Sequence, residues 1–301
     1  MRLKNYLIEA NTTKASNMEK HIVDAWNEGT DDEGLIKIIQ YLKDQGVTGS
    51  AHHMKGMFPV TGKWKEYHPG KINKSYPKTD LIIGSHRISL KTGKKYHIAG
   101  SRKDESIAIF YAAVDLGNID IENKLVKKLE SGLHSLIKKG TIFNTVKKSR
   151  GKDDKLDEAG RIQKEVQVIL DDTFSNNERL KYYYIYELIS GTIKFGMENP
   201  ARATHVLNVN FDGSDTKLNS VDNSSYIKEV MSKCKFNISF ESQSRKTKKA
   251  LPGEREWKTT IRTMNEGIVS KIISFIKSAI NKGLHHFLDL LNITPNIDIS
   301  L

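Results

Sequence analysis

Cysteine, proline and long apolar runs are all scarce in this chain of 301 residues. Cys234 is the only cysteine, which excludes an intramolecular disulfide and favours a reducing compartment. There are six prolines and no Pro-rich or Gly/Ser-rich linker. No run approaches the roughly 18 apolar residues that span a membrane, and the first residues lack the apolar stretch of a signal peptide. We therefore expect a cytoplasmic protein.

Acidic residues are fewer than basic ones: Asp plus Glu number 36 and Lys plus Arg number 48, a net charge of +12. This balance favours an anionic partner, with nucleic acid as the first candidate and a membrane surface as the second. The basic residues gather in one segment of the first hundred or so residues. They are Lys63, Lys65, Lys71, Lys74, Lys78, Arg87, Lys91, Lys94, Lys95, Arg102 and Lys103.

Hydrophobic periodicity predicts an α/β (α+β) fold, a small mixed β-sheet flanked by helices. The expected helices cover residues 17–27, 31–45, 104–116, 121–139, 156–174, 177–190 and 265–291. The expected strands lie within 80–91, 96–98, 204–211, 235–241 and 254–261, and 193–196 is expected to be a short extended piece. The polar stretch 147–157 is the best candidate for a boundary.

The most informative segment is a predicted β-hairpin over residues 80–91. Asp80 begins its first strand and Lys91 ends its second. Because opposite ends of a short antiparallel pair lie side by side, the carboxylate and the ammonium are expected at one rim of the sheet. A metal-dependent phosphodiesterase uses such a pair to hold a cation and to orient water. Solvated strand ends that carry no function are the alternative reading.

The runs Pro77-Lys78-Thr79-Asp80 and Ile88-Ser89-Leu90-Lys91 resemble the PD-(D/E)xK nuclease superfamily, in particular its restriction-endonuclease-like, phage-type members. The resemblance implies catalytic roles for Asp80 and Lys91. The acidic residue expected two positions before the lysine is Ser89 here. Some members take this carboxylate from a neighbouring helix, and Glu19 is the first candidate for it. Glu105 and Glu187 are the alternatives.

The resemblance further implies Mg²⁺ (or Mn²⁺) held by Asp80 and Glu19, and a catalytic centre of Asp80, Lys91, Glu19 and Ser89. The expected substrate is nucleic acid, first of all double-stranded DNA, in a bacterial host cell or a phage particle. A homodimer is left open. Residues 1–146 would be the nuclease-like core, and residues 147–301 would complete its sheet or form a second lobe. The expected DNA contacts are Lys78, Arg87, Lys94, Lys95 and Arg102.

Ser89 also supports an alternative from another class, a non-catalytic nucleic-acid-binding or virion protein on a decayed nuclease fold. A peripheral membrane protein is less favoured, because the predicted terminal helix lacks Trp anchors. Zinc binding at His52 and His53 is disfavoured as well, since no cysteine lies near the pair and no His-x-x-x-His spacing occurs.

Overall fold

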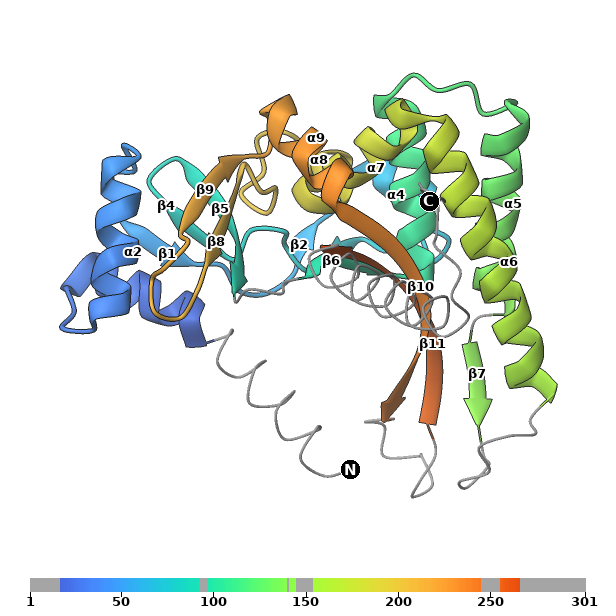
Figure 1. The fold of residues 1–301 in the computed structure, drawn as a ribbon, viewed down its shortest axis with the longest axis horizontal. Coiled ribbons are helices and arrows are strands. Elements are labelled where there is room, and N and C mark those ends of the chain that lie inside the picture. The colour runs from blue at the N-terminus through green and yellow to red at the C-terminus, as the bar shows by residue number, and fades with distance from the viewer. Residues whose placement is uncertain (1–16, 93–96, 140, 145–153, 245–254, 266–301) are drawn as a thin grey trace, which may run out of the picture.

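A five-stranded mixed sheet is the centre of one half of the molecule (Figure 1). The structure is a computed structural model that describes residues 17–92, 97–139, 141–144, 154–244 and 255–265. The strand order is β1-β4-β5-β8-β9. The strands are β1 (Ala51–His53), β4 (Leu81–Ile83), β5 (His86–Thr92), β8 (His205–Val209) and β9 (Lys217–Ser220). The predicted α/β fold, a mixed sheet flanked by helices, is thus confirmed.

The predicted hairpin is confirmed as β4 and β5, paired antiparallel with Leu81 opposite Ile88. Its turn needs glycine at position 84, where φ is +56° and an added Cβ would lie 2.0 Å from the carbonyl oxygen of Thr48. On its other edge β5 pairs with β8 in parallel, with Ile88 opposite His205. Both β5 and β8 therefore end at the same edge of the sheet.

Helices cover both faces of this sheet. The helix over 17–28 and α2 (Glu33–Asp44) share one apolar core with Leu81, Ile88 and Leu207. Asp32 caps α2 by accepting a hydrogen bond from the amide of Leu35. On the opposite face, Val206 belongs to the larger core built on α4 (Lys103–Leu116), α5 (Lys124–Lys139), α6 (Asp154–Asn176) and α7 (Glu178–Ser190).

A second, antiparallel sheet lies against α5 and α6 (Figure 1). Its strands are β6 (His97–Arg102), β7 (Thr141–Asn144), β10 (Cys234–Ser244) and β11 (Arg255–Asn265). Gln167 of α6 accepts a hydrogen bond from the amide of Ile238 and donates one to the carbonyl of Phe236. A helix side chain thereby satisfies backbone groups on β10 that its pairing with β11 leaves free.

The short elements depart most from the sequence-based expectations. They are β2 (Phe58–Pro59), α3 (Gly62–Tyr67), β3 (Lys74–Ser75), α8 (Thr192–Phe195) and α9 (Ser224–Lys233). Residues 193–196 were predicted to be extended, which is wrong, because residues up to Phe195 form α8. The cause is Glu187, whose carboxylate accepts hydrogen bonds from the amides of Ile193 and Lys194 and so stabilises the turn.

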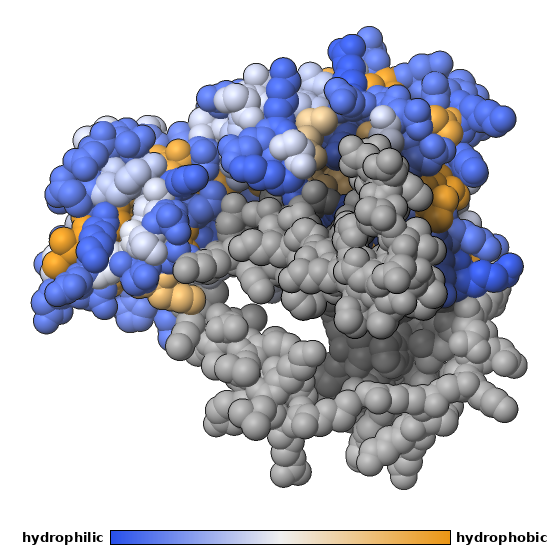
Figure 2. Space-filling view, viewed as in Figure 1, coloured by the Kyte–Doolittle hydropathy of each residue, from blue (hydrophilic) through white to orange (hydrophobic). Residues whose placement is uncertain are grey.

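Strands from both sides of residue 146 take part in each large sheet: β8 joins β5, and β11 joins β6. The predicted terminal helix over 265–291 lies outside the described residues, apart from Asn265, which ends β11. No helix in the described ranges is both long and apolar enough to cross a membrane. On the face drawn in Figure 2, the described surface is mainly hydrophilic, and apolar side chains form small, separate patches.

Candidate active site

Asp80 is held firmly at the start of β4. Its amide donates to the carbonyl of Ile88 at 2.8 Å. Its Oδ2 atom accepts from the amide of Leu90 at 2.7 Å and from the hydroxyl of Ser89 at 3.2 Å. Within the described residues, the side chain of Asp80 thus accepts two hydrogen bonds, both through Oδ2. The hairpin itself fixes the orientation of this carboxylate.

Lys91 reaches the same place from the end of β5. Its Nζ atom donates to the hydroxyl of Ser89 at 2.8 Å, so that Ser89 bridges Lys91 and Asp80. Burial lowers the pKa of Lys91, and the negative charges of Asp80 and Glu19 only partly oppose this. Asn208 lies opposite Lys91 on β8, and its buried Oδ1 atom has no hydrogen-bond partner among the described residues.

Glu19 approaches this group from the helix over 17–28. Its Oε2 atom lies 2.8 Å from Nε2 of His53, the last residue of β1. Burial raises the pKa of Glu19 and the charge of Asp80 raises it further, while His53 and Lys91 act in the opposite direction. The carboxylate of Glu19 is therefore within electrostatic reach of both Asp80 and Lys91. The four predicted catalytic residues converge at one end of the sheet.

The two alternative carboxylates are engaged elsewhere. Glu105 on α4 pairs with Nζ of Lys194 at 2.8 Å and with Nζ of Lys78 at 3.2 Å. Burial by itself would raise the pKa of Glu105, but the two lysines outweigh it and lower that pKa to about 2. Burial raises the pKa of Glu187 to about 7, although the amides of Ile193 and Lys194 donate to it. Glu105 and Glu187 thus form a second polar group around Lys194.

The predicted DNA-contacting residues do not lie together on one surface of the described structure. Lys78 lies in the ion pair with Glu105. Arg87 is half-buried and donates from Nη1 to the carbonyl of Asn199 at 3.1 Å. Arg102 belongs to the other sheet, where it is paired with Thr260 of β11. Lys94 and Lys95 lie outside the described residues.

Sequence reasoning missed His53 as a partner of Glu19. The pattern that identifies it is strand pairing: His53 lies opposite Leu81, the residue after Asp80. This register becomes visible only when β1 is placed beside β4. The Nδ1 atom of His53 is buried without a hydrogen-bond partner among the described residues.

The donor set suits a hard divalent cation. Mg²⁺ prefers oxygen ligands, keeps several waters and is usually bound through one or two carboxylates, which Asp80 and Glu19 could supply. Within the described ranges, no group of three or more His, Cys, Asp or Glu side chains could hold a metal ion. Two carboxylates completed by water are therefore the most that these residues offer.

Comparisons with protein-family models, with curated proteins and with solved structures find no match to this chain.

Proposed function

We propose that this protein is a Mg²⁺-dependent (or Mn²⁺-dependent) endodeoxyribonuclease that hydrolyses phosphodiester bonds. The observation that supports the proposal is the convergence of Asp80, Glu19 and Lys91 at one end of the five-stranded sheet, from three separate elements. Two carboxylates can hold a divalent cation, and a lysine beside them can orient water and stabilise developing charge, which are the roles that metal-assisted phosphodiester hydrolysis uses.

Asp80 and Glu19 would hold the cation, which when bound polarises the phosphoryl oxygen and lowers the pKa of a ligating water. Asp80 is suited to this because the amide of Leu90 fixes its carboxylate before any ligand arrives. His53 orients Glu19 through the contact at 2.8 Å. These residues would thus present their oxygens without a large rearrangement.

Lys91 would orient the attacking water and stabilise the charge that develops on the phosphate. Its pKa is lowered by burial, so the ammonium can release a proton more readily than an exposed lysine. Ser89 takes the place of the acidic residue and holds Lys91 Nζ at 2.8 Å. A neutral hydroxyl can position the lysine, but it contributes no charge to a metal site.

The experiment is cleavage of supercoiled plasmid with Mg²⁺, with Mn²⁺ or with EDTA. We expect nicking that EDTA abolishes and that Asp80→Ala, Glu19→Ala and Lys91→Ala each lower by at least about 100-fold. Asp44→Ala and Lys37→Ala remove the same chemical groups from exposed positions on α2 and serve as matched controls. Cleavage that survives Asp80→Ala would refute the assignment.

The second candidate is a non-catalytic nucleic-acid-binding or virion protein on a decayed nuclease fold. Ser89 favours it, because the position between Asp80 and Lys91 carries no charge. Under this alternative the wild-type protein binds DNA but leaves the plasmid intact with either metal ion. The same assay therefore separates the two candidates.

A further inference from the structure

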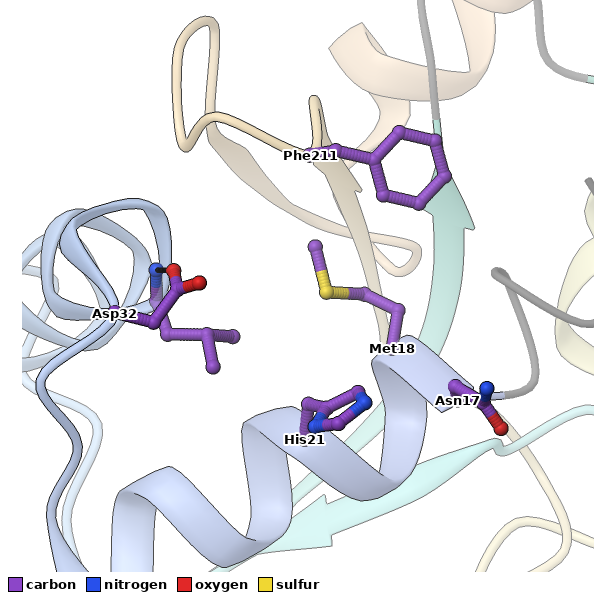
Figure 3. A pocket seen from close by; sticks show the side chains of 6 residues that line it. Asn17, Met18, His21, Asp32 and Phe211 are labelled. Carbon is purple, nitrogen blue, oxygen red and sulfur yellow. Dashed lines mark hydrogen bonds between the residues drawn. The ribbon is translucent and has the colours of Figure 1, made fainter.

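A small pocket with a volume of about 250 Å³ lies at the same end of the five-stranded sheet as the candidate active site. It is below the range of about 300–1,000 Å³ that is usual for drug-sized ligands, so it has room for a single planar ring system. Figure 3 shows Met18 and His21 on one helix, Asp32 at the start of α2, and Phe211 across from them. The lining residues are Asn17, Met18, His21, Asp32, Leu35 and Phe211.

The topology places this pocket at the catalytic end of the sheet. Met18 directly precedes Glu19, whose carboxylate is within electrostatic reach of Asp80. Phe211 follows β8, which runs parallel to β5 and pairs Val209 with Thr92, next to Lys91. Phe211 and Lys91 therefore lie at the same end of two adjacent strands, and a DNA strand bound across this end of the sheet would have both within its reach.

The chemistry of the lining favours a neutral aromatic ligand over a phosphate. Among the residues that the structure describes, no lysine or arginine lines the pocket, and the carboxylate of Asp32 would repel an anion. Phe211 is 46% exposed although it is a large apolar ring, so its face is available for stacking. Met18 is buried and provides an apolar surface, whereas the side chain of Asp32 can accept hydrogen bonds.

Phe211 is held in a defined place relative to Asp32. A Cβ added to Gly34 in the first turn of α2 would lie only 2.8 Å from the carbonyl oxygen of Phe211. A Cβ on Gly213, where φ is +71°, would lie 2.5 Å from the carbonyl oxygen of Gly34. The turn after β8 is therefore packed directly against α2, which preorganises the aromatic wall and the acceptor of the pocket.

We propose that this pocket holds one unpaired nucleobase of the substrate strand, stacked on Phe211 and donating an exocyclic amino group to Asp32. The proposal rests on the proposed function, since it places the base beside the phosphate to be cleaved. Carboxylates accept from the amino groups of cytosine and adenine, which thymine lacks. The substrate class is then DNA with a single-stranded or flipped-out nucleotide at the cleavage site.

The test is binding of short fluorescent oligo-dC, oligo-dA and oligo-dT strands in EDTA, followed by anisotropy. Phe211→Ala and Phe211→Leu should weaken binding roughly 5- to 150-fold, the range that loss of one base-stacking contact implies, and Phe211→Tyr should retain it. Ile36→Ala is the matched control, because Ile36 is also 46% exposed and lies on α2 outside the pocket.

Asp32→Asn tests base preference without removing the helix cap, since Asn and Asp cap helices equally well. We expect this variant to reduce the preference for oligo-dC or oligo-dA over oligo-dT. The proposal is overturned if Phe211→Ala binds like Ile36→Ala, or if single strands do not bind. If binding depends on Phe211 but the plasmid is not cleaved, the pocket proposal stands and the nuclease proposal is refuted. If the plasmid is cleaved but binding does not depend on Phe211, the nuclease proposal stands and the pocket proposal is refuted.

Discussion

At the residue scale, the central position is Ser89, which accepts from Nζ of Lys91 and donates to Oδ2 of Asp80. The side chain is 5% exposed, so any replacement must satisfy both neighbours without help from water. An aspartate here would supply the missing acidic group. It would also add a negative charge beside Asp80 and Glu19, a repulsion that Lys91 relieves in part and that a bound cation would relieve further.

We predict that Ser89→Asp lowers stability in EDTA and that Mg²⁺ raises the melting temperature of this variant more than that of the wild type. The physical reason is that a third carboxylate increases cation affinity, and ligand binding stabilises the folded state by mass action. Thermal unfolding at several Mg²⁺ concentrations measures this. Ser89→Ala is the control, and an absence of any Mg²⁺ effect on all three proteins would argue against a metal site.

A second residue-scale prediction concerns Glu105, which lies between Lys78 and Lys194. Removing the charge of Glu105 leaves the ammonium groups of Lys78 and Lys194 without their anionic partner. We therefore expect Glu105→Gln to lower the free energy of unfolding by about 3–5 kcal/mol at pH 7. The pKa of Glu105 is lowered in the folded state to about 2. Its stabilising contribution is therefore complete above the unfolded pKa and is lost as the pH falls towards 2.

Urea unfolding at a series of pH values checks this prediction. The gap in unfolding free energy between wild type and Glu105→Gln should stay constant between about pH 5 and 7 and shrink below about pH 5. Glu66→Gln, at an exposed position on α3, should show little difference at any pH. A gap that widens in acid would mean that Glu105 is not held as a carboxylate by the two lysines.

At the scale of elements, the junction between α7 and α8 brings together Glu187 of α7 and Lys194 of α8, which pairs with Glu105. Gly191 ends α7 in the left-handed region, with φ at 68° and ψ at 36°, and α8 begins at the next residue. The sharp turn brings the amides of Ile193 and Lys194 back to Glu187. It also brings Gly191 close to the side chain of Lys78.

We predict that Gly191→Ala destabilises the protein by about 1–2 kcal/mol from backbone conformation alone. The added Cβ would also lie 2.9 Å from Cγ of Lys78 and 3.1 Å from Cδ2 of Phe195, which adds a steric cost. Gly62→Ala is the matched control, because no atom of the described residues lies within 4 Å of a Cβ built at this position in α3. Chemical denaturation should therefore find Gly62→Ala neutral or stabilising, and equal losses in both variants would contradict the argument.

At the scale of the whole molecule, part of the net charge of +12 comes from lysines that lie close in sequence to the candidate active site. The segment from Lys63 to Lys91 is rich in lysine and ends at the candidate active site. Within this segment Lys63 pairs with Asp115 and Lys78 with Glu105, whereas Lys71 and Lys74 are exposed. Lys71 and Lys74 are therefore better candidates for contacts with DNA phosphates than Lys63 and Lys78, which are already in ion pairs.

We predict that binding to duplex DNA in EDTA weakens with salt and is insensitive to sequence. The double variant Lys71→Gln, Lys74→Gln should make the slope of log K against log salt concentration less steep by about 1.8, because each phosphate contact contributes about −0.9. Lys124→Gln with Lys128→Gln changes the same net charge from exposed positions on α5. Equal slopes for the two double variants would show that Lys71 and Lys74 do not touch the backbone.

The sequence by itself determined what depends on neighbouring residues. The hairpin places Asp80 and Lys91 together because a tight turn and alternating apolar residues fix the register of two short strands. The cap at Asp32 and the end of α7 at Gly191 are local as well. In each of these cases the interaction that decides the structure lies within a few residues along the chain.

Only the tertiary structure decided which distant groups meet. Glu19 contacts His53 across 34 positions, and β8 joins β5 after all the helices from α4 to α8. The capping of α8 by Glu187 reversed the extended conformation expected there. Periodicity identifies the face of an element that is buried, but not the element that buries it, because that choice depends on packing between segments far apart in the chain.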